Sequence, residues 1–134
     1  MLLEINHHSG VPIYRQVIEQ IRRQIMAGQL SEGEQLMSVR DLAAQLRVNP
    51  MTISKAYALL EVEGLVERRR GIGLFVGKLQ KDKKAHTKVQ LLEEVLKKAA
   101  VTAVQLEIPE EKAIEMLAML YKKYDSRTRS PSNE

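Results

Sequence analysis

The chain has 134 residues, of which 44% are hydrophobic, which is enough for one ordinary domain or a small domain with an appendage. It has no cysteine, which excludes disulfides and cysteine-based metal sites, and 4% aromatic residues without tryptophan, which argues against a stacking platform for single-stranded nucleic acid. The net charge of +4 permits a nucleic-acid partner without locating one, because residues 1–77 carry 9 Lys/Arg against 8 Asp/Glu.

The chain has no run of about 20 apolar residues that could span a bilayer, and its first residues lack the basic and apolar regions of a secretory signal. We therefore expect a cytoplasmic protein without a membrane partner.

The first predicted element is an amphipathic helix that opens at Pro12 and stops at Gly28, with apolar positions at Tyr14, Val17, Ile18, Ile21 and Ile25. The segment before it, which contains His7 and His8, is expected to be flexible.

Two short helices follow with almost no chain between them. Ser38 and Asp41 have the spacing of a capping box, and an apolar stripe then runs from Val39 to Leu46. The next helix is predicted to start at Asn49 and Pro50, a good N-cap and a proline at the first helical position, and to end before Gly64. So brief a connection forces a steep crossing, which is the helix-turn-helix geometry.

Two β-prone runs, 65–68 and 74–76, flank a turn that contains Gly71 and Gly73, and they predict a basic hairpin. A basic hairpin directly after a helix-turn-helix is a wing. We therefore predict a mainly helical α+β fold, with a winged helix-turn-helix domain over 1–77 followed by a short two-helix region.

The remaining chain is predicted to contain a polar linker or frayed helix start over 78–86, two helices over 87–125, and a disordered tail over 126–134. Apolar residues recur every three or four positions in both helices, which is typical of a pairing seam. An alternative is a helix hairpin that packs back on its own winged domain. The residues that we assign to dimerisation are Val89, Leu92, Leu96, Ala99, Ala103, Leu106, Ile114, Leu117, Tyr121 and Tyr124.

Candidate DNA-binding residues lie off the apolar stripe of the second helix of the motif, whose first turns enter the major groove in helix-turn-helix proteins. They are Met51, Thr52, Ser54 and Lys55, with Asn49 acting mainly as the cap. Arg40 is a further candidate, because a cation in the first turn of a helix opposes the helix dipole and a phosphate contact explains it better. Each of these could instead be an ordinary solvated residue.

Arg68, Arg69 and Arg70 form the densest positive charge of the chain, next to Gly71. Strand alternation sends Arg69 to the face opposite Arg68 and Arg70, and at least one of the three is expected to meet phosphate or the minor groove. The three histidines are too scattered for a metal site, and we find no catalytic constellation, so we expect neither a cofactor, a metal nor an enzyme.

These features resemble the GntR family of bacterial transcription factors over about 11–76. The resemblance is carried by Pro12-Ile13-Tyr14, Leu36-Met37-Ser38-Val39-Arg40-Asp41-Leu42-Ala43, Val48-Asn49-Pro50-Met51-Thr52-Ile53 and Gly71-Ile72-Gly73-Leu74-Phe75-Val76. It implies that Arg40, Asn49, Met51, Thr52 and Ser54 contact operator DNA, and that Arg70 and Gly71 form the wing tip.

Two residues depart from the family pattern. Met37 stands where the family usually has proline, and Arg47 stands where the turn usually has glycine. A side chain at a left-handed position costs about 1 kcal/mol, so we expect the turn to be adjusted locally. Neither change removes a DNA donor, and Arg47 could add one.

The Asn-Pro-x-Thr start and the short tail are most similar to the YtrA subgroup, whose small two-helix C-terminal region serves dimerisation. Only 57 residues (134 − 77) follow the wing, too few for a large effector pocket, and whether a small effector exists is unknown. The resemblance implies a homodimeric repressor of a transporter operon that binds an inverted repeat in double-stranded DNA. A non-specific architectural DNA-binding protein and an adaptor that has lost DNA binding are the alternatives.

Overall fold

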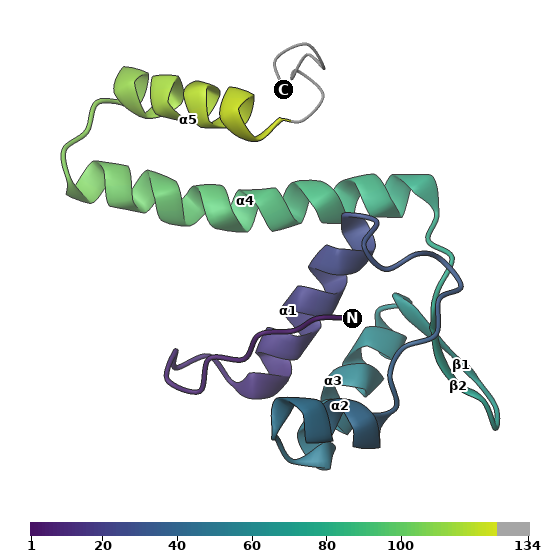
Figure 1. Ribbon diagram of the computed structural model, residues 1–134. Coiled ribbons are helices and arrows are strands. Elements are labelled where there is room, and N and C mark those ends of the chain that lie inside the picture. Colours follow the sequence, from purple (N-terminus) through teal and green to yellow (C-terminus); the bar gives the residue numbers. More distant parts are fainter. Residues whose placement is uncertain (126–134) are drawn as a thin grey trace, which may run out of the picture. The chain divides into compact units, whose positions relative to one another are not determined.

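The computed structural model describes residues 1–125, so the predicted disordered tail 126–134 lies outside the described residues. The chain falls into two compact units, Met1–Val89 and Gln90–Glu134. Its elements are α1 (Ile13–Met26), α2 (Val39–Leu46), α3 (Pro50–Val62), β1 (Val66–Arg69), β2 (Gly73–Val76), α4 (Lys81–Gln105) and α5 (Glu110–Tyr124), shown in Figure 1. The predicted α+β class, mainly helical with a winged helix-turn-helix, is confirmed.

The helix-turn-helix begins where the capping residues predict it. Ser38 Oγ accepts a hydrogen bond of 3.0 Å from the amide of Asp41, and Asn49 Oδ1 accepts one of 2.9 Å from the amide of Met51. Each cap satisfies an amide that the first turn of its helix would leave unpaired. The two caps fix where α2 and α3 start and therefore which faces of these helices are exposed.

The expectation that the turn between α2 and α3 would be adjusted is wrong. Arg47 itself adopts the left-handed conformation, with φ 56° and ψ 48°, and its amide still bonds to the carbonyls of Ala43 and Ala44. The backbone bonds that close α2 and the short link to α3 hold the residue there, although its Cβ opposes that conformation.

α3 is the centre of the winged domain, because α1 and α2 both pack against it and β1 follows it directly (Figure 1). The predicted apolar stripe of α3 belongs to the core, and each residue of the stripe is at most 2% exposed. These residues are Ile53, Ala56, Tyr57 and Leu60. Tyr57 also donates a 2.8 Å hydrogen bond from its hydroxyl to the carbonyl of Met37, which ties α3 to the residue before the α2 cap.

The wing is an antiparallel hairpin in which Glu67 lies opposite Phe75 and Arg69 opposite Gly73. The outer edge of β2 is also paired, since the segment 33–36 runs along it. The amide of Leu36 donates to the carbonyl of Leu74 at 2.8 Å, and the amide of Val76 donates to the carbonyl of Glu34 at 2.8 Å. This third extended segment, which the sequence patterns do not reveal, anchors the base of the wing to the body of the domain.

The segment before α1 was predicted to be flexible, but it is tied to that helix by three glutamine side chains. Gln16 is 9% exposed, accepts from the amide of Asn6 and donates to its carbonyl, both at 2.9 Å. Leu3, in the same segment, is buried. The pairs along the helix are Gln16 with Asn6, Gln20 with Glu4, and Gln24 with Leu2.

The helix predicted to start near Thr87 begins at Lys81 instead, so most of 78–86, predicted as a linker or a frayed helix start, belongs to α4. Lysine and alanine are good helix formers and Asp82 suits the positive helix start, although this stretch has no apolar stripe to reveal it. No described helix is long and apolar enough to cross a membrane.

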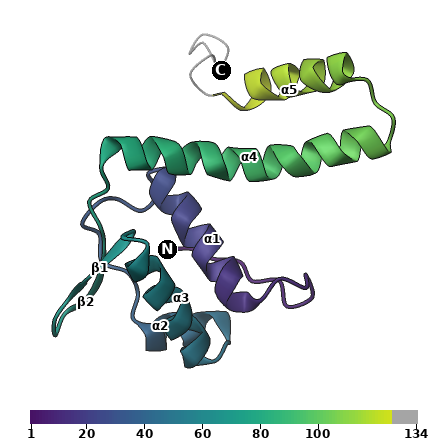
Figure 2. The ribbon, with the colours of Figure 1, turned by 180° about the vertical axis from the view of Figure 1, so that it is seen from behind.

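The second unit consists of the later part of α4 and of α5, which returns alongside it (Figure 2). Neither helix contains a buried residue. Glu107 in the connection adopts a left-handed conformation with φ 56°, and Pro109 precedes the first turn of α5. The apolar residues of this unit are thus not covered by the helices themselves.

Candidate nucleic-acid interface

The first turns of α3 expose the residues predicted to enter the major groove. Met51 is 77% exposed, Ser54 and Lys55 are exposed, and Thr52 is half-buried. Their separation from the buried stripe follows from the helical repeat, since residues on the stripe are fixed by packing against α1 and α2. This face offers hydroxyl and ammonium donors and one flexible apolar side chain, a combination that suits phosphate oxygens and thymine methyl groups.

Lys55, a predicted DNA contact, also has a partner within the protein. Its Nζ lies 4.0 Å from the centroid of the Tyr14 ring, in a cation–π contact between α3 and α1. The ring restrains the lysine side chain, while the ammonium keeps its donors for other partners.

The cations at the two helix starts have no ionic partner in the part of the chain that the structure describes. Arg40 lies in the first turn of α2, and Arg47 lies in the turn that leads to α3; both are exposed. Neither forms an ion pair with any residue of 1–125. Asn49 uses its oxygen for the α3 cap and retains its amide group as a donor.

The three arginines of the wing differ in their surroundings. Arg68 Nη2 lies 3.3 Å from Glu61 Oε1, in an ion pair with the last turns of α3. Arg69 extends over the Phe75 ring, with its guanidinium carbon 4.0 Å from the centroid. Arg70 is exposed at the turn with no ion pair among residues 1–125, next to Gly71, whose φ of 77° favours glycine. The wing tip therefore presents Arg70 as its available cation.

The sequence patterns missed two residues at the wing. Gln35 donates from Nε2 to the carbonyl of Ile72 across 3.2 Å, and so connects the segment 33–36 to the wing turn. Ile72 is 64% exposed beside Gly71. A single polar residue in a turn-rich segment carries no periodicity, so no signal in the sequence marked Gln35.

Among the described residues no group of three or more His, Cys, Asp or Glu side chains could hold a metal ion. The titratable group with a clear shift is structural: burial raises the pKa of Tyr57 far above its ordinary value. The Tyr57 hydroxyl donates its hydrogen bond to the carbonyl of Met37, away from the exposed face of α3.

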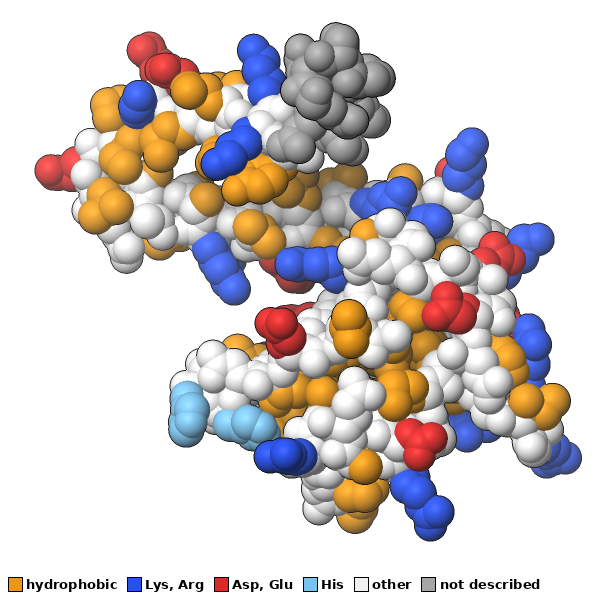
Figure 3. Space-filling model, in the orientation of Figure 1, with side chains coloured by type: hydrophobic (Ala, Val, Ile, Leu, Met, Phe, Trp, Pro, Cys, Tyr) orange, Lys and Arg blue, Asp and Glu red, His pale blue; other side chains and the backbone are white. Residues whose placement is uncertain are grey.

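Most of the predicted pairing residues of α4 and α5 are exposed in the single chain, and Figure 3 shows hydrophobic side chains at the surface of these helices. The larger ones range from Leu96, at 36% exposed, to Tyr124, at 73%. Ala103 is half-buried, and Ala99 is exposed.

Comparisons with known proteins agree with this geometry. The family described as bacterial regulatory proteins, gntR family, matches residues 13–76. The chain is 36% identical over 102 residues to the HTH-type transcriptional repressor YtrA of Bacillus subtilis, which covers 76% of this chain and 78% of the relative.

Solved structures give the same result. A GntR family transcriptional regulator from Listeria monocytogenes superimposes with a TM-score of 0.71 and 31% identity, covering 83% of this chain and 96% of that one. YtrA from Sulfolobus acidocaldarius, a GntR-family transcription factor, gives a TM-score of 0.53 and 26% identity over 92% of this chain and 100% of that one. The chain belongs to the GntR family of bacterial regulatory proteins and is a DNA-binding transcriptional regulator.

Proposed function

We propose that this regulator is a homodimeric repressor that binds an inverted-repeat operator. The observation that carries the proposal is the exposed face of α3, where Met51, Thr52, Ser54 and Lys55 stand on a helix whose start is capped and whose opposite face is buried. A rigid helix with polar and basic side chains at its N-terminal end is the element that helix-turn-helix proteins insert into the major groove.

The available cations precede and follow α3 in the sequence, and they bind phosphate groups of the DNA. Arg40 and Arg47, which both precede the recognition helix, bind the DNA backbone, because each is exposed and lacks an acidic partner in the described chain. Arg70 and Gly71 enter the adjacent minor groove, where glycine allows a close backbone approach. Arg68 contributes less, since Glu61 already neutralises it.

A second copy of the chain covers the exposed seam of α4 and α5. The apolar residues there recur at coiled-coil spacing, and leaving so many of them in water is unfavourable. A closed pair of chains has twofold symmetry, so its two recognition helices read the same half-site in opposite directions. The expected operator is therefore a palindrome.

We infer the direction of regulation from the relatives and the setting from the family resemblance. The Bacillus subtilis relative is named a repressor, and occupation of an operator hinders polymerase. We assign the protein to the cytoplasm, where bacterial DNA lies, and to regulation of a transporter operon, with no enzymatic activity.

The test of DNA recognition is selection of bound duplexes from a random pool, followed by affinity measurements at one salt concentration. The best site should be palindromic and should bind at least ~10³ times more tightly than random DNA. Arg40→Ala should weaken operator binding, whereas Arg23→Ala, at the exposed end of α1, should not. Equal affinity for random DNA would indicate a non-specific architectural protein, and no effect of Arg40→Ala with Lys55→Ala would indicate an adaptor.

The test of pairing is sedimentation at micromolar concentration. The native chain should sediment as a dimer, and Leu92→Glu or Leu117→Glu should shift it to the monomer by placing a carboxylate in the apolar seam. Lys97→Glu, also in α4 but off the seam, should leave the dimer intact. A monomeric native chain would contradict the pairing.

A further inference from the structure

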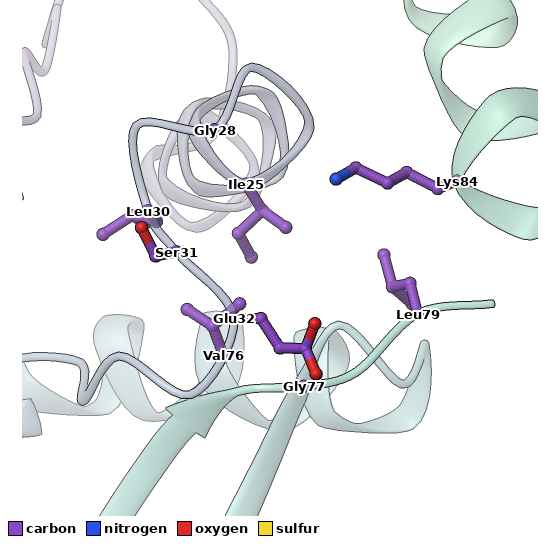
Figure 4. A pocket seen from close by; sticks show the side chains of 9 residues that line it. All are labelled: Ile25, Gly28, Leu30, Ser31, Glu32, Val76, Gly77, Leu79 and Lys84. Carbon is purple, nitrogen blue, oxygen red and sulfur yellow. The ribbon is translucent and has the colours of Figure 1, made fainter. Parts of the chain in front are cut away.

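A cavity of about 260 Å³ opens within the first compact unit, and none of the residues that line it belongs to α3 (Figure 4). It is bounded by the end of α1, the turn that follows it, the end of β2 and the first turns of α4. Pockets for drug-sized ligands usually measure about 300–1,000 Å³. This cavity therefore suits a metabolite of modest size.

One part of the cavity is apolar. Ile25, Leu30 and Val76 belong to the buried core and present their side chains at its wall, and the half-buried Leu79 faces them from the segment before α4. Figure 4 shows Ile25 and Leu79 on opposite sides of the open space. A short aliphatic group between Ile25 and Leu79 would make apolar contacts with both side chains and remove their surface from water.

Two opposite charges face the same space. Lys84 is half-buried and extends its ammonium from α4 toward Ile25, and Glu32 brings its carboxylate in beside Gly77 (Figure 4). The two side chains do not pair with each other, and neither forms an ion pair with another residue of 1–125. A partly desolvated ammonium without a counter-ion is unfavourable. A carboxylate from outside the chain would relieve that cost.

We propose that this cavity binds a small zwitterion with a short aliphatic side chain, of the size and chemistry of an aliphatic amino acid. The ligand's carboxylate pairs with Lys84, its ammonium pairs with Glu32, and its aliphatic part packs between Ile25 and Leu79. Both charges of the ligand are matched, and charge-assisted hydrogen bonds of this kind are stronger than neutral ones.

Such a ligand would touch the core of the winged domain and the first turns of α4 at once. If the protein represses as proposed above, occupancy would change operator affinity to the extent that the ligand prefers one arrangement of these parts. That consequence rests on the proposed function, whereas binding itself does not, so the two are measured separately.

The experiment titrates L-leucine into the full-length isotope-labelled chain without DNA and follows the amide resonances. We expect saturable shifts at residues 28–32 and 76–79 at millimolar concentration or below. 4-Methylpentanoate, which lacks the ammonium, and 3-methylbutylamine, which lacks the carboxylate, should each bind about tenfold more weakly. Equal binding of either half-ligand, or no saturable shift in these segments, would overturn the proposal.

Three variants locate the site. Lys84→Ala and Glu32→Gln should each weaken leucine binding about tenfold, as loss of the matching charge from the ligand does. Lys88→Ala, one turn further along α4 and outside the cavity, should bind leucine like the native chain. Native leucine affinity in Lys84→Ala would show that the ligand lies elsewhere. Operator affinity with and without leucine then reports the regulatory step independently.

Discussion

Lys55 and Tyr14 lie on different helices, 41 positions apart in the sequence, yet the Lys55 ammonium stands 4.0 Å from the centroid of the Tyr14 ring. The contact holds this cation of α3, which we propose as the recognition helix, in place in the free protein. Part of the ordering that a phosphate contact requires is therefore already present in the free protein.

Replacing the ring should weaken operator binding through Lys55. Tyr14→Leu removes the π face, and since an exposed cation–π contact is worth about 0.5–1 kcal/mol, the affinity should fall about two- to fivefold. Tyr14→Phe keeps the face and should bind like the native protein. Fluorescence anisotropy at fixed salt measures both, and a loss with Tyr14→Phe would assign the effect to the hydroxyl instead.

Arg70 and Arg68 should differ although they are two residues apart. Arg70→Ala should reduce affinity for all sequences and lower the slope of log affinity against log salt by about 1, as expected for one lost phosphate contact. Arg68→Ala should have a smaller effect, because Glu61 already pairs with that side chain. Identical salt slopes for the two variants would contradict the assignment.

Gln35 should matter for DNA binding without touching DNA. Gln35→Met keeps the length of the side chain but removes the amide that donates to Ile72, so the wing turn loses its link to the body of the domain. Operator affinity should fall severalfold with loss of minor-groove protection in hydroxyl-radical footprints, and circular dichroism should be unchanged. Gln29→Met, on the exposed turn after α1, serves as the control.

Arg47→Gly should separate stability from binding. Glycine relieves the left-handed strain at φ 56°, so the free energy of unfolding should rise by up to about 1 kcal/mol, less the entropy glycine adds to the unfolded chain. Operator affinity should fall because a cation is lost. Arg47→Ala should lower affinity equally without the gain in stability; denaturant titration distinguishes the two.

Tyr57→Phe should cost about 1–2 kcal/mol of stability, since the part-buried carbonyl of Met37 loses its donor. The pKa of Tyr57 is raised in the folded state, so the unfolded chain loses this proton first as the pH rises. Native stability should therefore decline above the ordinary tyrosine pKa of about 10. The decline should be shallower in Tyr57→Phe, as measured by urea unfolding at several pH values.

The winged domain was predictable because its signals are local. The caps at Ser38 and Asn49 and the stripe of α3 each follow from the spacing of a few neighbouring residues. The start of α4 was predicted too late because Lys81 begins a stretch without apolar periodicity, so no local signal marks it.

The sequence could not predict which partners the individual charged side chains contact. The pairing of Arg68 with Glu61 and of Lys55 with Tyr14 depends on how α3 meets the wing and α1, which spacing along one element does not encode. The DNA-contacting roles of these residues and the pairing of α4 and α5 remain predictions for the experiments above.

The glutamines of α1 have a further consequence. Four residues of helix rise about 6 Å, and two residues of extended chain cover about 6.6 Å, so the two repeats nearly coincide. The side chains at 16, 20 and 24 can thus form hydrogen bonds with residues 6, 4 and 2 of a segment that runs antiparallel to the helix. The spacing of the glutamines on the helix therefore sets the register of that segment. Removing one residue from 3–5 would displace at least one of the three hydrogen-bonded pairs.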